Sequence, residues 1–163
     1  MFNVVLVEPE IPANTGNIAR TCAASGTALH LVRPLGFSLD DRQLKRAGLD
    51  YWHLLDINYY DSFSELFEKH RDAKFFFATT KGGQVYSEFD IPDGSFFVFG
   101  KETKGLPEEL LKEHLDTCVR IPMVEGARSL NLCNSVAIVL FEALRQHNFE
   151  DMRLFGKLKG TEF

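Results

Sequence analysis

The sequence has few of the features that mark metalloproteins, secreted proteins and membrane proteins. Its three cysteines, Cys22, Cys118 and Cys133, form no C-x-x-C pair, so neither a zinc site nor a dithiol redox motif is indicated. No apolar run approaches the roughly 20 residues of a membrane span. The apolar start at residues 2–7 is too short for a signal peptide and lacks a basic segment before it. We therefore expect a reduced, cytoplasmic protein with no membrane contact and no metal.

An excess of positive charge is also absent. The chain has 18 Lys and Arg against 23 Asp and Glu, a net charge of −5, which excludes a uniformly basic nucleic-acid binder. The distribution is uneven, because residues 11–49 contain five basic residues and only two acidic ones. The acidic residues gather in residues 50–75, 88–93 and 108–116. A local basic segment can follow RNA phosphates on an acidic protein, so a structured RNA stays open as a partner.

Several common enzyme signatures are incomplete or missing. Residues 100–105 have the G-x-x-x-x-G spacing of a phosphate-binding loop, but Leu106 and Pro107 follow where Lys and Ser or Thr would be needed, which argues against an NTPase. The first apolar run is followed by E-P-E-I-P instead of G-x-G-x-x-G, which argues against dinucleotide-binding and Rossmann-type methyltransferase folds. No G-x-S-x-G elbow is present. His70, His114 and His147 fall near expected helix C-termini, where a structural role is favoured.

Short apolar runs alternate with helical patterns along the chain. This alternation predicts an α/β fold, with a mostly parallel sheet of five or six strands and helices on both faces. We expect strands at residues 4–7, 28–32, 53–57, 74–79, 95–99 and 117–121, and helices at 14–24, 40–47, 62–69, 107–114 and 131–147. Asn14 is expected to cap the first helix and Gly26 to stop it. No repeat or linker divides the chain, so we expect one domain over residues 1–163, with little pattern from about residue 151.

Polar residues follow several of these strands, where ligands bind in open α/β sheets. Asn14, Asn17 and Arg20 recur at a spacing of three, which places them on one helix face near its start. They form either a polar cluster in which Arg20 holds a phosphate or a capped helix with a solvated arginine. Ser129 and Asn131 likewise fit a capping turn.

Three segments together resemble the three motifs of the SPOUT methyltransferases. They are P-E-I-P-A-N-T-G-N-I-A-R at residues 9–20, F-G-K-E-T-K-G-L-P at 99–107, and I-P-M at 121–123 with R-S-L-N-L-C-N-S at 128–135. The resemblance is to the 2′-O-ribose branch and, within it, to the TrmL (YibK) type, which methylates the wobble nucleotide of tRNA. Residues 35–37 and 46–51 also look like that subgroup, and the resemblance extends to about residue 147.

The resemblance implies a fold, a reaction and partners. The fold is the α/β knot, whose C-terminal trefoil knot forms the S-adenosylmethionine site, although general topology rules disfavour knots. The implied reaction is methylation of the ribose 2′-OH at position 34, cytidine or modified uridine, in the anticodon stem-loop of leucine tRNAs. The family acts as a homodimer, with the first and last helices as expected contact surfaces. A catalytically idle RNA-binding scaffold and a ribosomal RNA 2′-O-methyltransferase are the alternatives.

Site residues are transferred by motif position. The implied cofactor contacts are Ala78, Thr79, Gly100, Gly105, Ile121, Met123, Ser129 and Leu130, and the implied catalytic set is Arg20, Asn14, Glu102 and Asn131. Because a guanidinium is a poor base, we expect Arg20 to clamp a phosphate and stabilise developing negative charge. The basic residues expected to contact RNA are Arg42, Lys45, Arg46, Lys81 and Lys104. We expect RNA binding to weaken steeply with salt.

Overall fold

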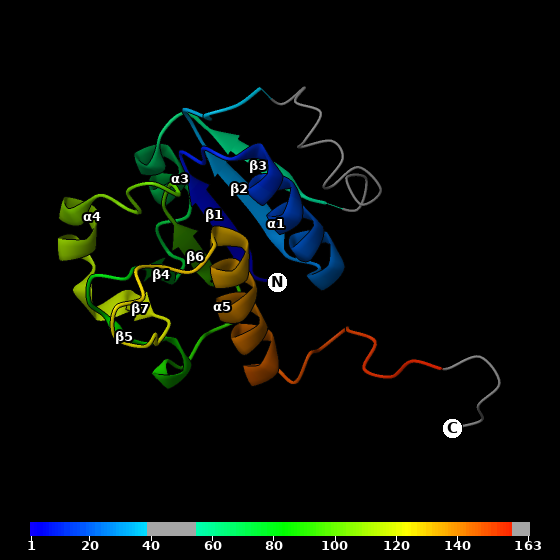
Figure 1. Ribbon diagram of the computed structural model, residues 1–163. Helices are drawn as coiled ribbons and strands as arrows, with labels where there is room; N and C mark the ends of the chain where they lie inside the picture. Colours follow the sequence, from blue (N-terminus) through cyan, green and yellow to red (C-terminus); the bar gives the residue numbers. More distant parts are fainter. Residues whose placement is uncertain (39–54, 158–163) are drawn as a thin grey trace.

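A parallel sheet lies at the centre of the molecule (Figure 1). The computed structural model describes residues 1–38 and 55–157. In these ranges the strands are β1 (Asn3–Val7), β2 (Ala28–Val32), β3 (Ile57–Tyr60), β4 (Phe75–Ala78), β5 (Gln84–Val85), β6 (Phe96–Phe99) and β7 (Cys118–Arg120). They form one sheet in the order β3-β2-β1-β6-β4-β7-β5, and every neighbouring pair is parallel. The predicted parallel α/β architecture is confirmed, with the short edge strand β5 in addition.

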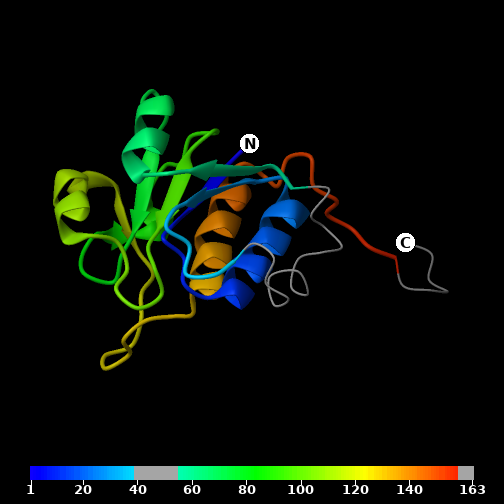
Figure 2. The same cartoon turned by 90° about the horizontal axis from the view of Figure 1, so that it is seen from above.

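Helices cover both faces of this sheet. Helices α1 (Pro12–Ser25) and α5 (Leu132–Gln146) lie side by side on one face (Figure 2). Helices α3 (Phe63–Lys69) and α4 (Glu108–Glu113) lie on the other face. The described part of the chain has no helix that is both long and apolar enough to cross a membrane.

The phenylalanine-rich strands β4 and β6 supply core to both helix layers. Phe76 and Phe97 pack in the same cluster as α1 and α5. Phe75, Phe77 and Phe96 pack in the cluster that contains buried residues of α3 and α4. Because successive side chains of a strand point to opposite faces, a strand buried on both sides has an uninterrupted apolar sequence.

Most predicted boundaries hold, and the start of α1 is one of the exceptions. Helix α1 begins at Pro12, with Ile11 as an N-cap that offers no side-chain hydrogen bond, so the predicted cap at Asn14 is wrong. Pro12 can start the helix earlier because the first helical N–H needs no partner within the helix. Gly26 ends α1 with φ +64°, as expected.

Two further differences concern the segment before α3. A strand was predicted at residues 53–57, of which 53 and 54 lie outside the described residues. Strand β3 begins at Ile57 and runs to Tyr60, and these two residues pair with Leu29 and Val32 of β2. The predicted helix at residues 40–47 lies outside the described residues. His70, His114 and His147 are the residues that end α3, α4 and α5, as the sequence predicted. The C-terminal trefoil knot stays a prediction.

The strand order places several loops at one edge of the sheet. From β1 the chain first moves outward to β2 and β3, whereas β6, β4 and β7 lie on the other side of β1. The connections after β1 and β6 therefore diverge at the boundary between these two halves, which is where open α/β sheets bind ligands. The loops that contain the three motifs begin at the carboxyl ends of β1, β6 and β7.

A buried histidine, His30 of β2, contacts polar side chains of the neighbouring strands β1 and β3. His30 is 3% exposed. Its Nε2 lies 3.0 Å from Asn3 Oδ1, and its Nδ1 lies 3.2 Å from the Tyr60 hydroxyl. The same hydroxyl lies 3.2 Å from His70 Nε2. Burial lowers the pKa of His30 to about 4, and the neighbouring His70 adds to this effect.

The His30 imidazole should make the fold sensitive to mild acid. Its pKa is lower in the folded chain than the ordinary value of 6.5, so the unfolded chain binds the proton more tightly. The stabilisation is present above pH 6.5 and is lost as the pH falls toward 4, by on the order of 3 kcal/mol in total. Urea denaturation at pH 7 and pH 5 measures this loss. A His30→Gln chain should show a smaller pH-dependent loss, and an equal loss would contradict the assignment.

Candidate functional site

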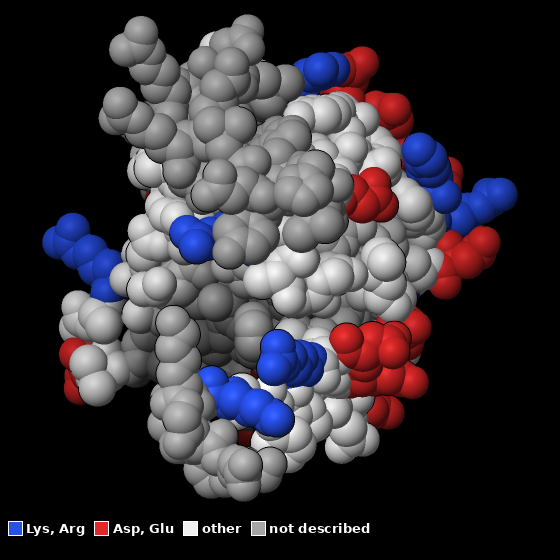
Figure 3. Space-filling view, turned by 90° about the vertical axis from the view of Figure 1, so that its right-hand side faces the viewer, with Lys and Arg blue, Asp and Glu red and all other residues white. Residues whose placement is uncertain are grey.

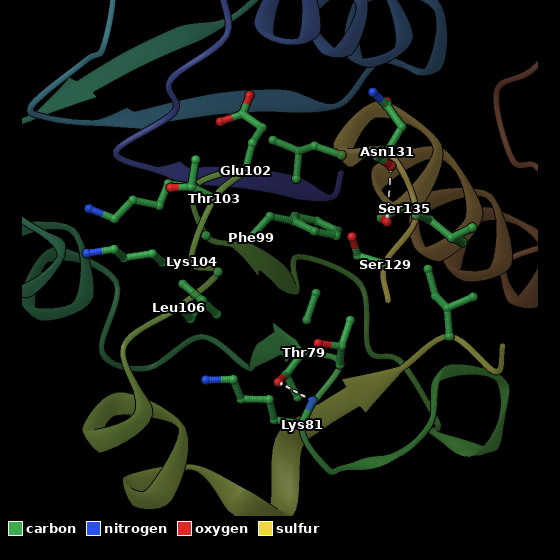
Figure 4. A pocket seen from close by; sticks show the side chains of 18 of the residues that line it. Thr79, Lys81, Phe99, Glu102, Thr103, Lys104, Leu106, Ser129, Asn131 and Ser135 are labelled. Atoms are coloured by element: carbon green, nitrogen blue, oxygen red, sulfur yellow. Dashed lines mark hydrogen bonds between the residues drawn. The ribbon is translucent and has the colours of Figure 1, made fainter. Parts of the chain in front are cut away.

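A cavity of about 600 Å³ opens at the carboxyl ends of β4, β6 and β7 (Figure 4). Its apolar wall includes Phe99, Leu106, Val119 and Ile121, and Val139 of α5 also contributes. The volume and the mixed polar and apolar lining are those of a small-molecule site. All eight predicted cofactor positions line it: Ala78, Thr79, Gly100, Gly105, Ile121, Met123, Ser129 and Leu130.

The other predicted site residues divide into three groups. Asn14, Glu102 and Asn131 line the same cavity, and so do Lys81 and Lys104. Arg20 is exposed on α1 and does not line the cavity, so the structure does not bring it together with the other three predicted catalytic residues within one chain. Arg42, Lys45 and Arg46 lie outside the described residues.

Glu102 binds the start of α1, although it lies in the loop after β6. Its Oε2 accepts a hydrogen bond from the Glu10 N–H at 2.8 Å, and its Oε1 accepts one from the Ile11 N–H at 3.2 Å. Helix α1 has no cap of its own, because Ile11 has no polar side chain. A carboxylate at a helix N-terminus is favoured by the orphan N–H groups and by the helix dipole. Glu102 therefore acts as the cap of α1 from a distant loop.

Asn14 joins this carboxylate to the start of α5. Its Nδ2 donates to Glu102 Oε1 at 3.1 Å, and its Oδ1 accepts from Asn131 Nδ2 at 3.2 Å. Asn131 in turn accepts the Cys133 N–H on its own Oδ1 at 2.8 Å, which caps α5. The Cys133 thiol lies 3.4 Å from Asn14 Oδ1. The Asn14 amide is only 8% exposed, and both of its ends are used.

A second connection between the first two loops runs through Glu10 and Thr103. The Thr103 hydroxyl donates to Glu10 Oε2 at 2.8 Å, and the Thr103 N–H donates to the same oxygen at 3.0 Å. These hydrogen bonds, the hydroxyl's first, lower the pKa of Glu10. Sequence reasoning assigned no role to Glu10, Thr103 or Cys133, because residues far apart in one sequence give no local signal of contact.

The two glycines of the second loop are needed for different reasons. A Cβ on Gly100 would lie 2.1 to 2.4 Å from backbone atoms of Gly105 and Leu106, so only glycine allows this close approach. Gly105 has open space around it but adopts φ +69°, which strains other residues. Gly100 therefore allows a close approach of two backbone segments, whereas Gly105 meets a conformational requirement.

Some of the basic side chains that line the cavity form ion pairs, and others do not. Lys81 forms an ion pair with Glu108 at 2.5 Å, and Lys101 forms one with Glu8. The hydrogen bond to Glu8 raises the pKa of Lys101, and the hydrogen bond from Lys81 lowers the pKa of Glu108. Among the residues that the structure describes, Lys104 and Arg128 have neither a hydrogen bond nor an ion pair.

The site therefore combines an apolar slot with a polar, charged rim. Figure 4 shows Lys81 and Lys104 on one side of the cavity and Ser129 and Asn131 on the other. In the described ranges no group of three or more His, Cys, Asp or Glu side chains is arranged to hold a metal ion. The arrangement suits an aromatic, polar small molecule inside and an anionic partner at the rim.

Neutralising Glu102 should loosen the site as well as α1. In Glu102→Gln the new NH₂ group faces N–H donors, so at least one of the hydrogen bonds that Glu102 accepts is lost. We expect the free energy of unfolding to fall by about 1–3 kcal/mol, measured by urea denaturation. The control is Glu109→Gln, which removes the same charge from an exposed pair with Lys112 on α4 and should change stability by less than about 0.5 kcal/mol. Equal effects would contradict the capping role.

Comparisons with known proteins identify the family. Residues 1–141 match the model of the SpoU rRNA methylase family. The chain is 50% identical over 150 residues to a tRNA (cytidine(34)-2′-O)-methyltransferase of Methylovorus glucosotrophus (strain SIP3-4), covering 91% of this chain and 97% of that one. It is 58% identical over 155 residues to a protein of Bacillus subtilis (strain 168) whose name gives the same activity provisionally, covering 93% and 97%.

Solved structures agree with these sequence matches. A structure described under "Structural insights into the 2-OH methylation of C/U34 on tRNA" superposes with a TM-score of 0.87 at 45% identity, covering 91% of this chain and 97% of that one. The SpoU methyltransferase AviRb from Streptomyces viridochromogenes, in complex with AdoMet, superposes with a TM-score of 0.77 at 26% identity, covering 93% and 58%. The family match over residues 1–141, the relatives and the shared fold establish that this chain belongs to the SpoU rRNA methylase family.

Proposed function

We propose that this chain is an S-adenosylmethionine-dependent RNA methyltransferase that acts on the ribose 2′-OH of the tRNA wobble nucleotide. The observation that carries the proposal is that eight motif positions from separate loops line one cavity of about 600 Å³. The name of the Methylovorus relative, at 50% identity, supports the reaction and the substrate. The AdoMet complex of AviRb supports the cofactor. One cytoplasmic domain over residues 1–163 performs the reaction.

The lining residues fit this cofactor. Phe99, Leu106 and Ile121 offer an apolar slot for an adenine ring. When bound, S-adenosylmethionine supplies a methyl group on a positively charged sulfur. Thr79, Met123, Ser129 and Leu130 would line its polar and aliphatic parts from the loops after β4 and β7.

Arg20 is the proposed catalytic contact to the RNA. Methyl transfer needs the 2′-OH aligned with the methyl group and stabilised as its proton leaves. A guanidinium can hold a phosphate with two parallel hydrogen bonds and stabilise the developing charge, but it cannot accept the proton. Since Arg20 does not line the cavity of its own chain, it acts at the cavity of a second copy.

A homodimer is therefore part of the proposal. Helices α1 and α5 lie side by side on one face, and Phe141 of α5 is 42% exposed. Figure 3 shows an area without charged side chains, bordered by Lys and Arg, on the side of the molecule that lies to the right in Figure 1. Burial of the exposed Phe141 side chain against a second copy would remove an apolar group from water.

The finer substrate assignment follows the resemblance. The target nucleotide is cytidine or a modified uridine at position 34 in the anticodon stem-loop of leucine tRNAs, and the cofactor cavity is enclosed by a trefoil knot. Lys81, Lys104 and the segment with Arg42, Lys45 and Arg46 are the proposed RNA contacts.

Methyl transfer can be tested directly. The chain is incubated with radiolabelled S-adenosylmethionine and with separate tRNA and ribosomal RNA pools, and the modified nucleotide is then mapped. We expect label at the 2′-O of position 34 in tRNA. Label only in ribosomal RNA would replace the substrate assignment, and cofactor binding without any transfer would favour an idle RNA-binding scaffold.

The proposed role of Arg20 predicts a specific kinetic defect. Arg20→Lys keeps the positive charge but loses the two-pronged geometry, so we expect turnover to fall about 100-fold. The matched control is Arg71→Lys, an exposed arginine after α3 that does not line the cavity, which should keep wild-type turnover. If Arg20→Lys keeps nearly the wild-type turnover rate and the wild-type RNA affinity, the two-pronged hydrogen bonding of Arg20 is not needed.

A further inference from the structure

Among the described residues, four basic side chains line the cavity, and two of them form no ion pair. Lys81 and Lys101 are paired with Glu108 and Glu8. In the described ranges Lys104 and Arg128 form no ion pair and no hydrogen bond. The motif transfer assigned no role to Arg128, which directly precedes the predicted cofactor residue Ser129.

These two residues belong to different loops. Lys104 lies in the loop between β6 and α4, and Arg128 lies in the loop between β7 and α5. Both side chains belong to exposed residues, so each can meet a large partner at the rim without losing an existing bond. Lys81 and Lys101, in contrast, would have to exchange a carboxylate for a phosphate, which reduces the net gain.

The charge of the proposed cofactor indicates which kind of ligand Lys104 and Arg128 bind. S-adenosylmethionine has a positive sulfonium and ammonium and one carboxylate, so it is a cation overall. Unpaired Lys and Arg side chains beside a cationic ligand raise the electrostatic energy unless an anion joins them. The guanidinium group of Arg and the ammonium group of Lys are the side-chain groups that most often bind phosphodiesters. The guanidinium can do so with two hydrogen bonds.

We infer that Arg128 and Lys104 form a phosphate-binding pair at the rim of the cavity and hold the RNA backbone next to the target nucleotide. This inference rests on the proposed function. It extends that proposal because it assigns phosphate binding to the two basic side chains that form no ion pair. Arg128 is thereby a substrate-binding residue, and its loop has a role in RNA binding as well as in cofactor binding.

The test compares three single variants of the full chain. Arg128→Gln and Lys104→Gln remove the free cations, and Lys112→Gln is the matched control, because Lys112 is paired with Glu109 on the exposed face of α4. Binding of a fluorescently labelled anticodon stem-loop RNA is measured by anisotropy at several salt concentrations. Binding of S-adenosylmethionine is measured by calorimetry. The KM for RNA and kcat are determined in the methyl-transfer assay.

Each rim variant should weaken RNA binding roughly tenfold and reduce the slope of log affinity against log salt by about 0.7–0.9. The loss should appear in the KM for RNA, with cofactor affinity as in the wild type. If the wild type binds and methylates tRNA but the salt slopes of Arg128→Gln and Lys104→Gln equal that of Lys112→Gln, this inference is wrong and the proposed function still stands. A larger loss of cofactor affinity than of RNA affinity would assign Arg128 to the cofactor carboxylate instead. A wild type that neither binds nor methylates tRNA would overturn the proposed function together with this inference.

Discussion

The site depends on the orientation of one buried side-chain amide, that of Asn14. An amide has a donor end and an acceptor end, and here the Glu102 carboxylate fixes which end is which, because it can only accept. The other end of Asn14 must then accept from Asn131, whose own orientation is fixed by the Cys133 N–H. Hydrogen bonds thus run in one direction from the first turn of α5 through the first turn of α1 to the loop after β6. Loops that begin at three different strands are held around one cavity, and a cavity formed by separate loops needs such a connection to keep its shape.

The sequence predicted the parts of this fold that depend on local pattern and missed those that depend on contact. Short apolar runs indicated the strands that became β4 and β6, Gly26 indicated the end of α1, and Asn131 indicated a capping turn at the start of α5. The start of α1 was missed because its cap, Glu102, lies about 90 residues away in the sequence. The motif resemblance predicted the residues that line the cavity, because it compares several motifs of the chain at once. The role of Arg20 stays a prediction, because Arg20 does not line the cavity of its own chain.

The distribution of charge explains how an acidic protein can act on RNA. The net charge is −5, but the residues at the cavity rim include Lys81, Lys101, Lys104 and Arg128. Lys101 and Lys81 are paired with Glu8 and Glu108, whereas Lys104 and Arg128 form no ion pair with a described residue. Net charge therefore describes solubility and long-range attraction, whereas recognition depends on which individual charges are already paired.

The most direct test of the central claim is a double-mutant cycle between two residues that do not contact each other. Glu102→Gln and Asn131→Ala are made singly and together, and the free energy of unfolding and the affinity for S-adenosylmethionine are measured for each. If Asn14 couples the two loops, the effects should be non-additive by about 0.5 kcal/mol or more, and they should become additive when the cycle is repeated in an Asn14→Ala background. Additive effects in the chain that retains Asn14 would contradict the account.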